Sequence, residues 1–233
     1  MPQAIVIAGV LIAGALLISS IARQRMLMQP GLPSSEQVAE SGTEDQNQLA
    51  LTLPVEEGVD HVRGNPEGRI TIYEYSDIDC PFCQRFHTTL QTIVEENEEV
   101  RWVYRHLPLE ALHPEAFQKS VITECVAQLA GQDAFWEVID GMYENPTTLS
   151  DLPNYVAIYN LDSDEYATCL SSEEAAQRVE RDMANAFATR GSVQVGTPWS
   201  IIELPDGSRI PFSGAQPTSV LQGVVDAILA QAR

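Results

Sequence analysis

Between residues 69 and 97 the chain changes from one hydrophobic period to another. Residues 69–76, RITIYEYS, alternate, with Ile70, Ile72 and Glu74 on one face and threonine and tyrosine side chains on the other. A period of two residues is typical of a β-strand. Residues 82–97, FCQRFHTTLQTIVEEN, carry apolar side chains at helical spacing instead. The sequence therefore predicts a strand followed directly by an amphipathic helix.

The rest of the pattern predicts a second strand, a helical block and a hairpin. Residues 100–109, VRWVYRHLPL, are typical of a strand, and two short strands flank Asp206-Gly207, a strong hairpin signal. Between these parts we expect only helices, at residues 114–130, 133–143, 152–159, 163–170 and 173–189, and a last helix follows at residues 217–232. The order β, α, β, helices, β, β, α predicts one α/β sheet unit with an inserted helical block.

The N-terminal part has a different character. Residues 4–21 are apolar and uncharged, and their length is near the lower limit of a membrane-spanning helix. We therefore expect residues 1–22 to form a signal anchor, with a cleavable signal peptide as the alternative, since Ser20 and Ala22 suit the −3 and −1 positions. Two arginines follow, and the positive-inside rule would keep their side in the cytoplasm, against an outward-facing domain.

Residues 23–57 are predicted to be a flexible linker. Much of this segment is rich in Gln, Ser, Glu, Pro and Gly, and no aromatic residue occurs before Tyr73. Such a composition buries too little apolar surface to order the chain. We expect the ordered domain to begin near Gly58.

Composition and charge exclude some classes of function. The 233 residues include 33 Asp and Glu against 13 Lys and Arg, a formal net charge of −20. Such a charge repels phosphate backbones and anionic lipid surfaces, so nucleic acid is not an expected partner. A chain of this length also builds a core without disulfides. The four cysteines therefore need an explanation from chemistry or from the redox compartment.

Cys80 and Cys83, in the segment SDIDCPFCQRF, lie on the first turn of the predicted helix. The unpaired N–H groups and the dipole of a helix start favour an anion there, which lowers the pKa of a thiol. Pro81 suits the first helical position. We therefore predict that Cys80 is a nucleophilic thiolate and that Cys83 is the resolving thiol.

Three longer segments resemble one known family. GNPEGRITIYEYSDIDCPFC, HLPLEALHPEAF and VGTPWSIIELPDGSRIPFSGAQP are similar to the DsbA-like branch of the thioredoxin superfamily, over about residues 58–232. The resemblance implies a thioredoxin fold whose halves are residues 58–112 and 191–233, with residues 113–190 as an inserted helical domain. It also implies thiol–disulfide exchange outside the cytoplasm.

The resemblance further implies roles for residues around the cysteines. Thr197 and Pro198 match the family's Thr-Pro with a cis peptide bond beside the redox pair, where an extended substrate could pair with the backbone. Glu74 matches a buried acid six residues before the first cysteine. A buried glutamate has a raised pKa, so it could accept and return the proton of Cys83. Alternatively, Glu74 pairs with a basic residue or reaches the surface.

Phe82 departs from the best-known motif of this family, which has a histidine between the cysteines. A phenyl ring gives no cationic stabilisation to the Cys80 thiolate, and the carboxylates of Asp77 and Asp79 oppose it, with Arg85 as a partial offset. We therefore expect an oxidant that is milder than a strongly oxidising member. Phe82 and Pro81 are counted with Thr197 and Pro198 as the expected substrate-binding residues.

Other interpretations of the same cysteines are weaker. Cys80, Cys83 and His87 could be three ligands of a zinc or copper ion, but no second C-x-x-C completes the set. Two inert core thiols would not be expected at a helix start beside Pro81. A chaperone that binds unfolded chains through an apolar groove is compatible with catalysis and is also an alternative to it.

Cys125 and Cys169 both lie in the predicted helical block. In an oxidising compartment we expect a structural disulfide between them, and two separate buried thiols are the alternative.

Taken together, these features predict a membrane-anchored thiol–disulfide oxidoreductase of the cell envelope, outside the cytoplasm. It would introduce disulfides into unfolded exported proteins through a mixed disulfide at Cys80 that Cys83 resolves. A membrane quinone-linked reoxidant is implied by the family alone. We expect a monomer, because no dimerisation domain is evident, and neither a cofactor nor a metal. A disulfide isomerase or reductase remains the alternative enzyme.

Overall fold

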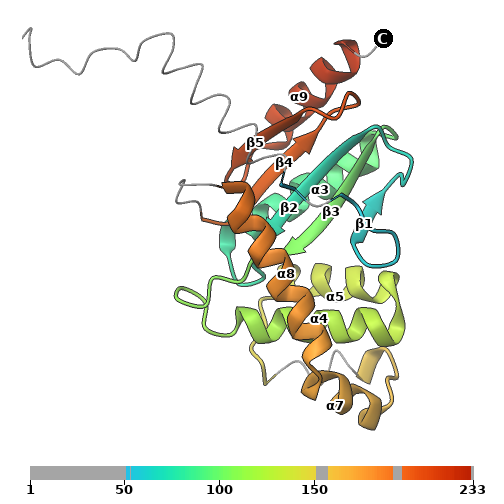
Figure 1. The fold of residues 1–233 in the computed structure, drawn as a ribbon, viewed down its shortest axis with the longest axis vertical. Coiled ribbons are helices and arrows are strands. Elements are labelled where there is room, and N and C mark those ends of the chain that lie inside the picture. Colours follow the sequence, from blue (N-terminus) through green and yellow to red (C-terminus); the bar gives the residue numbers. More distant parts are fainter. Residues whose placement is uncertain (1–50, 53, 151–156, 191–195, 232–233) are drawn as a thin grey trace, which may run out of the picture. The chain divides into compact units, whose positions relative to one another are not determined.

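A computed structural model describes residues 51–52, 54–150, 157–190 and 196–231 (Figure 1). The predicted signal anchor and most of the predicted linker lie outside the described residues. Among the helices that are described, none is both long and apolar enough to cross a bilayer.

Five strands form one mixed sheet. They are β1 (His61–Gly64), β2 (Ile70–Ser76), β3 (Val100–His106), β4 (Trp199–Glu203) and β5 (Arg209–Ser213), and their order in the sheet is β1-β3-β2-β4-β5. The central strand β2 runs parallel to β3 and antiparallel to β4. Every residue of β2 is buried, so both faces of this strand need cover.

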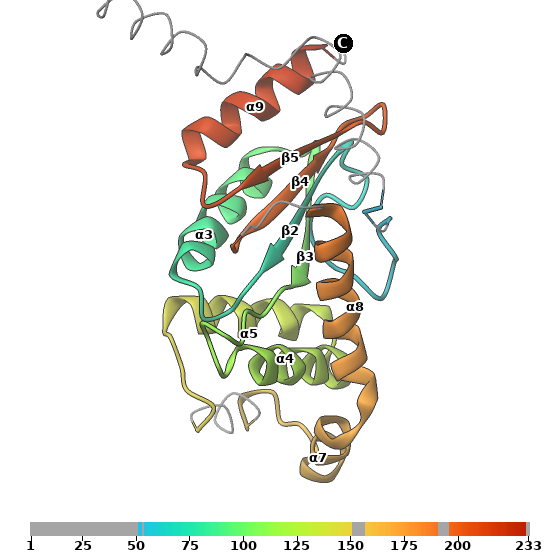
Figure 2. The same ribbon diagram turned by 60° about the vertical axis from the view of Figure 1, so that its left-hand side comes forward.

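Helices cover the two faces of the sheet differently (Figure 2). Helices α3 (Pro81–Glu96) and α9 (Thr218–Gln231) pack on one face, and α8 (Glu173–Arg190) packs on the other. The odd and even positions of β2 therefore enter two different cores. Side chains on the α3 face include Ile70, Ile72, Trp102, Phe86, Leu90 and Val225, and those on the α8 face include Tyr73, Tyr75, Val103, Trp199 and Ala186.

The helical block lies between β3 and β4 in the sequence. Its described helices are α4 (Ala116–Ala130), α5 (Gln132–Glu144), α7 (Ser163–Ser171) and α8. Most of the predicted helix at residues 152–159 lies outside the described residues. The predicted order of β, α, β, helices, β, β, α is confirmed, and so is the α/β fold class with an inserted helical block.

The hairpin predicted at Asp206-Gly207 is confirmed. The N–H of Leu204 donates to the carbonyl of Ser208 at 2.8 Å, which closes the turn between β4 and β5. Gly207 has φ +81°, a conformation that side chains with a Cβ rarely adopt. Glycine at this position therefore lets the chain reverse without strain.

Two features of the fold were not predicted. Strand β1 was missed, because four residues on the sheet edge are too short for a period to be recognised. The folded domain also begins earlier than Gly58. The buried guanidinium of Arg105 bonds to Asp60 at 3.0 Å and to the carbonyl of Pro54 at 3.2 Å. A buried charge needs such partners, so it holds the preceding segment against the sheet.

Cys125 on α4 and Cys169 on α7 form a disulfide. Both are buried in a small core within the helical block, together with Val121, Ala175 and Val179. The bridge joins positions 44 residues apart, so it restricts a long loop of the unfolded chain.

We expect the paired substitutions Cys125→Ala and Cys169→Ala to lower the free energy of unfolding by about 3 to 4 kcal/mol, because the unfolded chain regains the entropy of the open loop. Urea unfolding measures the change. A Cys80→Ala, Cys83→Ala background keeps the other thiols out of the comparison. A loss below about 1 kcal/mol would mean that the bridge contributes little.

Candidate active site

The candidate site lies where β2 ends and α3 begins. Cys80 is the N-cap residue of α3, with φ −80° and ψ 120°, and Pro81 takes the first helical position. The carbonyl of Cys80 accepts the N–H of Gln84 at 3.0 Å, the first hydrogen bond of the helix. Cys83 follows one turn later. The sequence folds this way because Pro81 has the backbone angle of a helix start and needs no N–H partner.

The Cys80 thiol is strongly acidified. Its pKa falls to about 5, first because the Cys83 side chain donates a hydrogen bond to the Cys80 sulfur, and further because Thr197 and the backbone N–H groups of Cys83 and Phe82 face it. Burial opposes this shift but is outweighed. Cys80 is therefore a thiolate at neutral pH.

Cys83 has the opposite character. It is fully buried, and burial raises the pKa of its thiol well above the ordinary value. The hydrogen bond to Cys80 and the charges of Glu74 and Cys80 raise the pKa of Cys83 further. The N–H of Asp77 lies 3.4 Å from the Cys83 sulfur and partly opposes the shift. One thiol of the pair is thus ready to react while the other keeps its proton.

The loop before β4 lies against Cys80. The peptide bond between Thr197 and Pro198 is cis. The Cys80 sulfur lies 3.4 Å from the carbonyl oxygen of Thr197. The carbonyl of Pro198 accepts the N–H of Gly214 at 2.9 Å, which ties this loop to the end of β5. The residues that the family resemblance placed beside the cysteines are therefore brought together with Cys80.

Glu74 is buried beneath the cysteines. Burial raises its pKa to about 8, although a hydrogen bond from Ser76 lowers it in part. The Ser76 hydroxyl donates to Glu74 Oε1 at 2.8 Å, and the indole of Trp102 also lowers the pKa of this carboxyl. No basic side chain pairs with Glu74 among the described residues, so the carboxyl can change its protonation near neutral pH.

Tyr143 connects Glu74 to the helical block. Its hydroxyl lies 2.9 Å from Ser76 Oγ and 3.3 Å from the hydroxyl of Tyr104. The side chain of Gln84 on α3 donates to the Tyr143 carbonyl at 2.5 Å. Tyr143 is also one of the residues that line a pocket of about 100 Å³ beside Cys80.

The two acidic residues before Cys80 differ from our expectation. Asp77 accepts hydrogen bonds from the Leu109 N–H at 2.7 Å and from His113 at 2.9 Å. Asp79 pairs with Lys119 of α4 at 2.6 Å. Lys119 of the helical block thus compensates the charge of Asp79, while the loop before α4 supplies hydrogen bonds to Asp77.

Phe82 is 53% exposed, and the Arg85 guanidinium lies over its ring, 4.6 Å from the centroid. Arg85 therefore packs on the aromatic ring.

The alternative metal set of Cys80, Cys83 and His87 is not assembled. His87 Nε2 bonds to Asp140 on α5 at 2.7 Å, and the described residues contain no group of metal-binding atoms that includes these cysteines. The sequence pattern could not show this, because Asp140 lies 53 residues away in the chain.

Sequence reasoning missed three residues of the site: Ser76, Lys119 and Tyr143. Ser76 and the tyrosine hydroxyl carry no recognisable motif. Lys119 stands between Gln118 and Ser120, so nothing in the sequence marks it as a buried residue.

We expect alkylation of reduced protein by iodoacetamide to follow one ionisation with a midpoint near pH 5, since Cys80 is a thiolate above that pH. In Cys83→Ala the main hydrogen bond to Cys80 is lost, and the midpoint should rise by about one pH unit or more. Peptide mapping identifies the alkylated residue, and Cys80→Ala is the control. An unchanged midpoint in Cys83→Ala would contradict this account of the acidity.

Comparison with known proteins agrees with this geometry. A family model described as thioredoxin matches residues 56–203. The crystal structure of DsbA2 from Pseudomonas aeruginosa is 25% identical with a TM-score of 0.61, covering 75% of this chain and 94% of that chain. The structure of alpha-DsbA1 from Wolbachia pipientis is 21% identical with a TM-score of 0.65, covering 79% of this chain and 97% of that one, and shares the fold.

Among curated proteins, the Na(+)/H(+) antiporter NhaA 3 of Salinispora tropica is 34% identical over 152 residues, which are 64% of this chain. The match covers 22% of the antiporter, so this chain spans about a fifth of the length of such relatives. The segment matched by the family model carries Cys80, Cys83 and Pro198. The chain belongs to the thioredoxin family and has the fold of its DsbA-like thiol–disulfide oxidoreductases.

Proposed function

We propose that this protein is a thiol–disulfide oxidoreductase that introduces disulfides into exported proteins outside the cytoplasm. The observation that carries the proposal is the opposed acidity of Cys80 and Cys83 on one helix turn, with Cys80 next to the Thr197 carbonyl. A thiol with a low pKa is both a good nucleophile at neutral pH and a good leaving group.

The reaction starts from the Cys80–Cys83 disulfide. A substrate thiolate attacks the Cys80 sulfur, a mixed disulfide forms, and Cys83 leaves as a thiolate that takes a proton from Glu74. A second substrate thiolate then attacks its own mixed-disulfide sulfur, releases Cys80 as a thiolate and leaves the substrate oxidised. Two electrons pass to the cysteine pair. If Cys83 attacks the mixed disulfide before the second substrate thiolate does, the Cys80–Cys83 disulfide forms again and the substrate leaves reduced.

Glu74 suits this proton transfer. A carboxyl with a pKa of about 8 is a proton donor below that pH and an acceptor above it. Its charge also raises the pKa of Cys83, so the two groups interact electrostatically. Ser76 and Tyr143 extend the hydrogen-bonded chain from Glu74 to the helical block.

The acidity of Cys80 bears on the direction of electron flow. The low pKa stabilises the reduced protein at pH values above about 5 and makes the disulfide a stronger oxidant. This supports oxidation over reduction of substrates.

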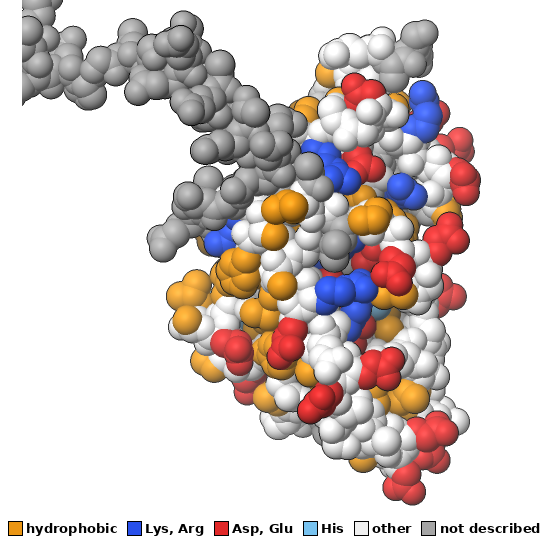
Figure 3. All heavy atoms as spheres, in the orientation of Figure 1, with side chains coloured by type: hydrophobic (Ala, Val, Ile, Leu, Met, Phe, Trp, Pro, Cys, Tyr) orange, Lys and Arg blue, Asp and Glu red, His pale blue; other side chains and the backbone are white. Residues whose placement is uncertain are grey.

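Substrates of the proposed enzyme are unfolded segments that contain cysteine. Phe82, beside Cys80, is 53% exposed, and Leu112, in the loop between β3 and α4, is 70% exposed. Figure 3 shows hydrophobic side chains gathered on the side of the molecule where that loop lies. Exposed apolar side chains near a nucleophile favour contact with apolar residues of an unfolded chain. The loop at Pro198 is proposed to pair with the substrate backbone.

The proposed location rests on two features. The Cys125–Cys169 disulfide is typical of an oxidising compartment, and residues 4–21 have the composition of a signal anchor. The same proposal includes a quinone-linked membrane partner that reoxidises the cysteine pair. It also includes a monomeric state.

A redox titration tests the proposed activity. The protein is equilibrated in glutathione or dithiothreitol buffers, and the thiols of Cys80 and Cys83 are trapped and counted. A two-electron transition between about −120 and −200 mV would support an oxidase or isomerase, while one near −270 mV would indicate a reductase. Oxidation of a reduced, unfolded test protein then separates an oxidase from an isomerase.

We expect Glu74→Gln to slow the attack of Cys83 on a trapped mixed disulfide by about tenfold to hundredfold, because the amide cannot accept the thiol proton. In the wild type the rate should rise with pH through about 8, as Glu74 loses its proton, and this inflection should be absent in the variant. Stopped-flow fluorescence measures the rate. Alkylation of Cys80 serves as the control and should change little, and equal rates in both proteins would rule out the relay.

Phe82→His should make the protein more oxidising by about 30 mV, a tenfold change in the equilibrium constant, since an imidazolium stabilises the Cys80 thiolate. Arg85, which already packs over this side chain, limits the gain by charge repulsion. Phe82→Leu adds no charge and is the matched control. A histidine variant that is less oxidising than the parent would contradict the proposed role of position 82.

A further inference from the structure

Three buried side chains outside the cysteine site converge on one point. His61 of β1, His106 of β3 and Glu124 of α4 place their metal-binding atoms within 4.8 Å of one another. Glu124 Oε1 lies 2.9 Å from His61 Nε2 and 3.2 Å from His106 Nε2. Each residue is at most 3% exposed. None of the three belongs to the hydrogen-bonded chain that links Glu74 to Tyr143.

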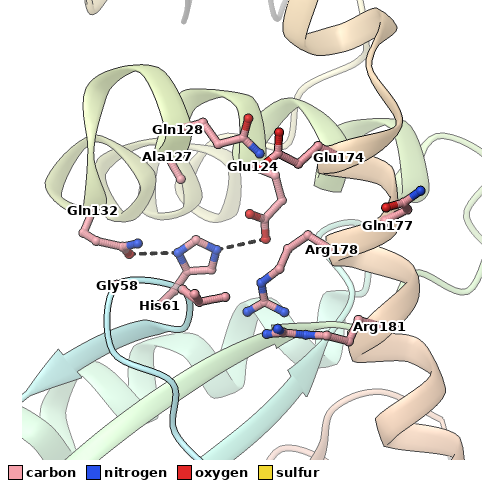
Figure 4. A pocket seen from close by; sticks show the side chains of 11 residues that line it. Gly58, His61, Glu124, Ala127, Gln128, Gln132, Glu174, Gln177, Arg178 and Arg181 are labelled. Carbon is pink, nitrogen blue, oxygen red and sulfur yellow. Dashed lines mark hydrogen bonds and ion pairs between the residues drawn. The ribbon is translucent and has the colours of Figure 1, made fainter.

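The hydrogen bond of His61 determines which of its nitrogens is free. Its Nδ1 lies 2.8 Å from Oε1 of Gln132 on α5 (Figure 4). Because an amide oxygen accepts, Nδ1 donates to Gln132, and Nε2 is the ring nitrogen that faces Glu124. A ring nitrogen and a carboxylate oxygen 2.9 Å apart need a positive charge between them, which either a proton or a metal ion supplies. Metal-bound histidines are oriented by the same kind of second hydrogen bond.

His106 also places a ring nitrogen next to Glu124. Its Nε2 faces the same carboxylate oxygen, while its Nδ1 is buried and has no hydrogen-bond partner among the described residues. Aromatic rings of Phe135 and Tyr104 pack against this imidazole. Two imidazole nitrogens and one carboxylate oxygen are the three ligands that zinc takes in many sites where water supplies the fourth.

The arginines near this cluster form ion pairs with other carboxylates. Arg178 of α8 forms ion pairs with Asp60 and Asp182, and Arg181 pairs with Glu56. Arg178 also interacts with the charge of Glu124, which opposes a cation at this point.

The cluster can be reached from solvent. A pocket of about 360 Å³ is lined by His61 and Glu124, with Gln128, Gln132, Glu174 and Arg178 around them. Figure 4 shows His61 between Gln132 and Glu124, with the arginines of α8 beside them. The pocket gives an ion a way in and leaves room for a water molecule as a further ligand.

We propose that His61, His106 and Glu124 form a binding site for one divalent transition-metal ion of the zinc type. The ion would accept electron pairs from the two Nε2 atoms and from Glu124, with water in the fourth position. Any proton shared between the imidazoles and Glu124 would be released to solvent. Because the ligands come from β1, β3 and α4, the ion would fasten the helical block to the sheet.

The test uses oxidised protein, in which the Cys80–Cys83 disulfide is closed and cannot bind metal. After treatment with a chelator, Zn²⁺ is titrated by calorimetry, and Co²⁺ reports the ligand geometry through its visible spectrum. We expect one equivalent of Zn²⁺ to bind, protons to be released, and the thermal unfolding midpoint to rise. None of these readouts depends on redox activity, so a failure here would not affect the proposed function.

Variants decide whether the ion binds at these residues. His61→Gln and Glu124→Gln should lose at least about a hundredfold in affinity, and Gln132→Ala, which removes only the orienting hydrogen bond, about tenfold. Glu174→Gln changes a carboxylate of the same pocket outside the ligand set and should bind as the wild type does. Circular dichroism checks that each variant is folded, and Gln132→Ala keeps the test decisive if substitution of a buried ligand prevents folding. If the wild type takes up no Zn²⁺, or if Gln132→Ala and the folded ligand variants bind it equally well, the site is a buried ion pair and the proposal is wrong.

Discussion

The burial of β2 on both faces is the constraint on which the rest of the structure depends. A strand that is buried on both faces can carry a polar side chain only if neighbouring elements complete the hydrogen bonds of that side chain. Glu74 receives one such bond from Ser76, Trp102 also lowers its pKa, and no basic side chain pairs with it among the described residues. The carboxyl is therefore held near its point of ionisation, directly below the helix turn that carries the two cysteines.

The helical block takes part in the site. Although the chain carries a net charge of −20, two acidic side chains at the junction with the sheet have basic partners. Lys119 from the block pairs with Asp79 beside the nucleophile, and Arg63 from the edge strand pairs with Asp140 of the block. Tyr143 from the block lies against Ser76. The block thus sets the electrostatic surroundings of the cysteines while the sheet sets their positions.

The fold and the cysteine pair could be predicted from the sequence because their signals are local. Alternation in β2, the helical stripe after Pro81 and the Asp206-Gly207 turn each lie within a few residues. Strand β1 was not predicted because it is short and lies at an edge of the sheet. The residues that were missed at the site depend on tertiary contacts: Tyr143 is 67 residues from Ser76, and Lys119 is 40 from Asp79. No period or motif connects positions so far apart, and a single sequence gives no other sign of them.

The Cys125–Cys169 disulfide has a consequence for how the protein matures. Four thiols can be joined into two bridges in three ways, and only one of these pairs Cys80 with Cys83. Either of the others would tie the nucleophile to α4 or α7 and leave no exchangeable couple. Every newly made molecule must therefore form its own two correct disulfides before it can oxidise the cysteines of another chain. The protein thus first undergoes the thiol–disulfide exchange that we propose it catalyses.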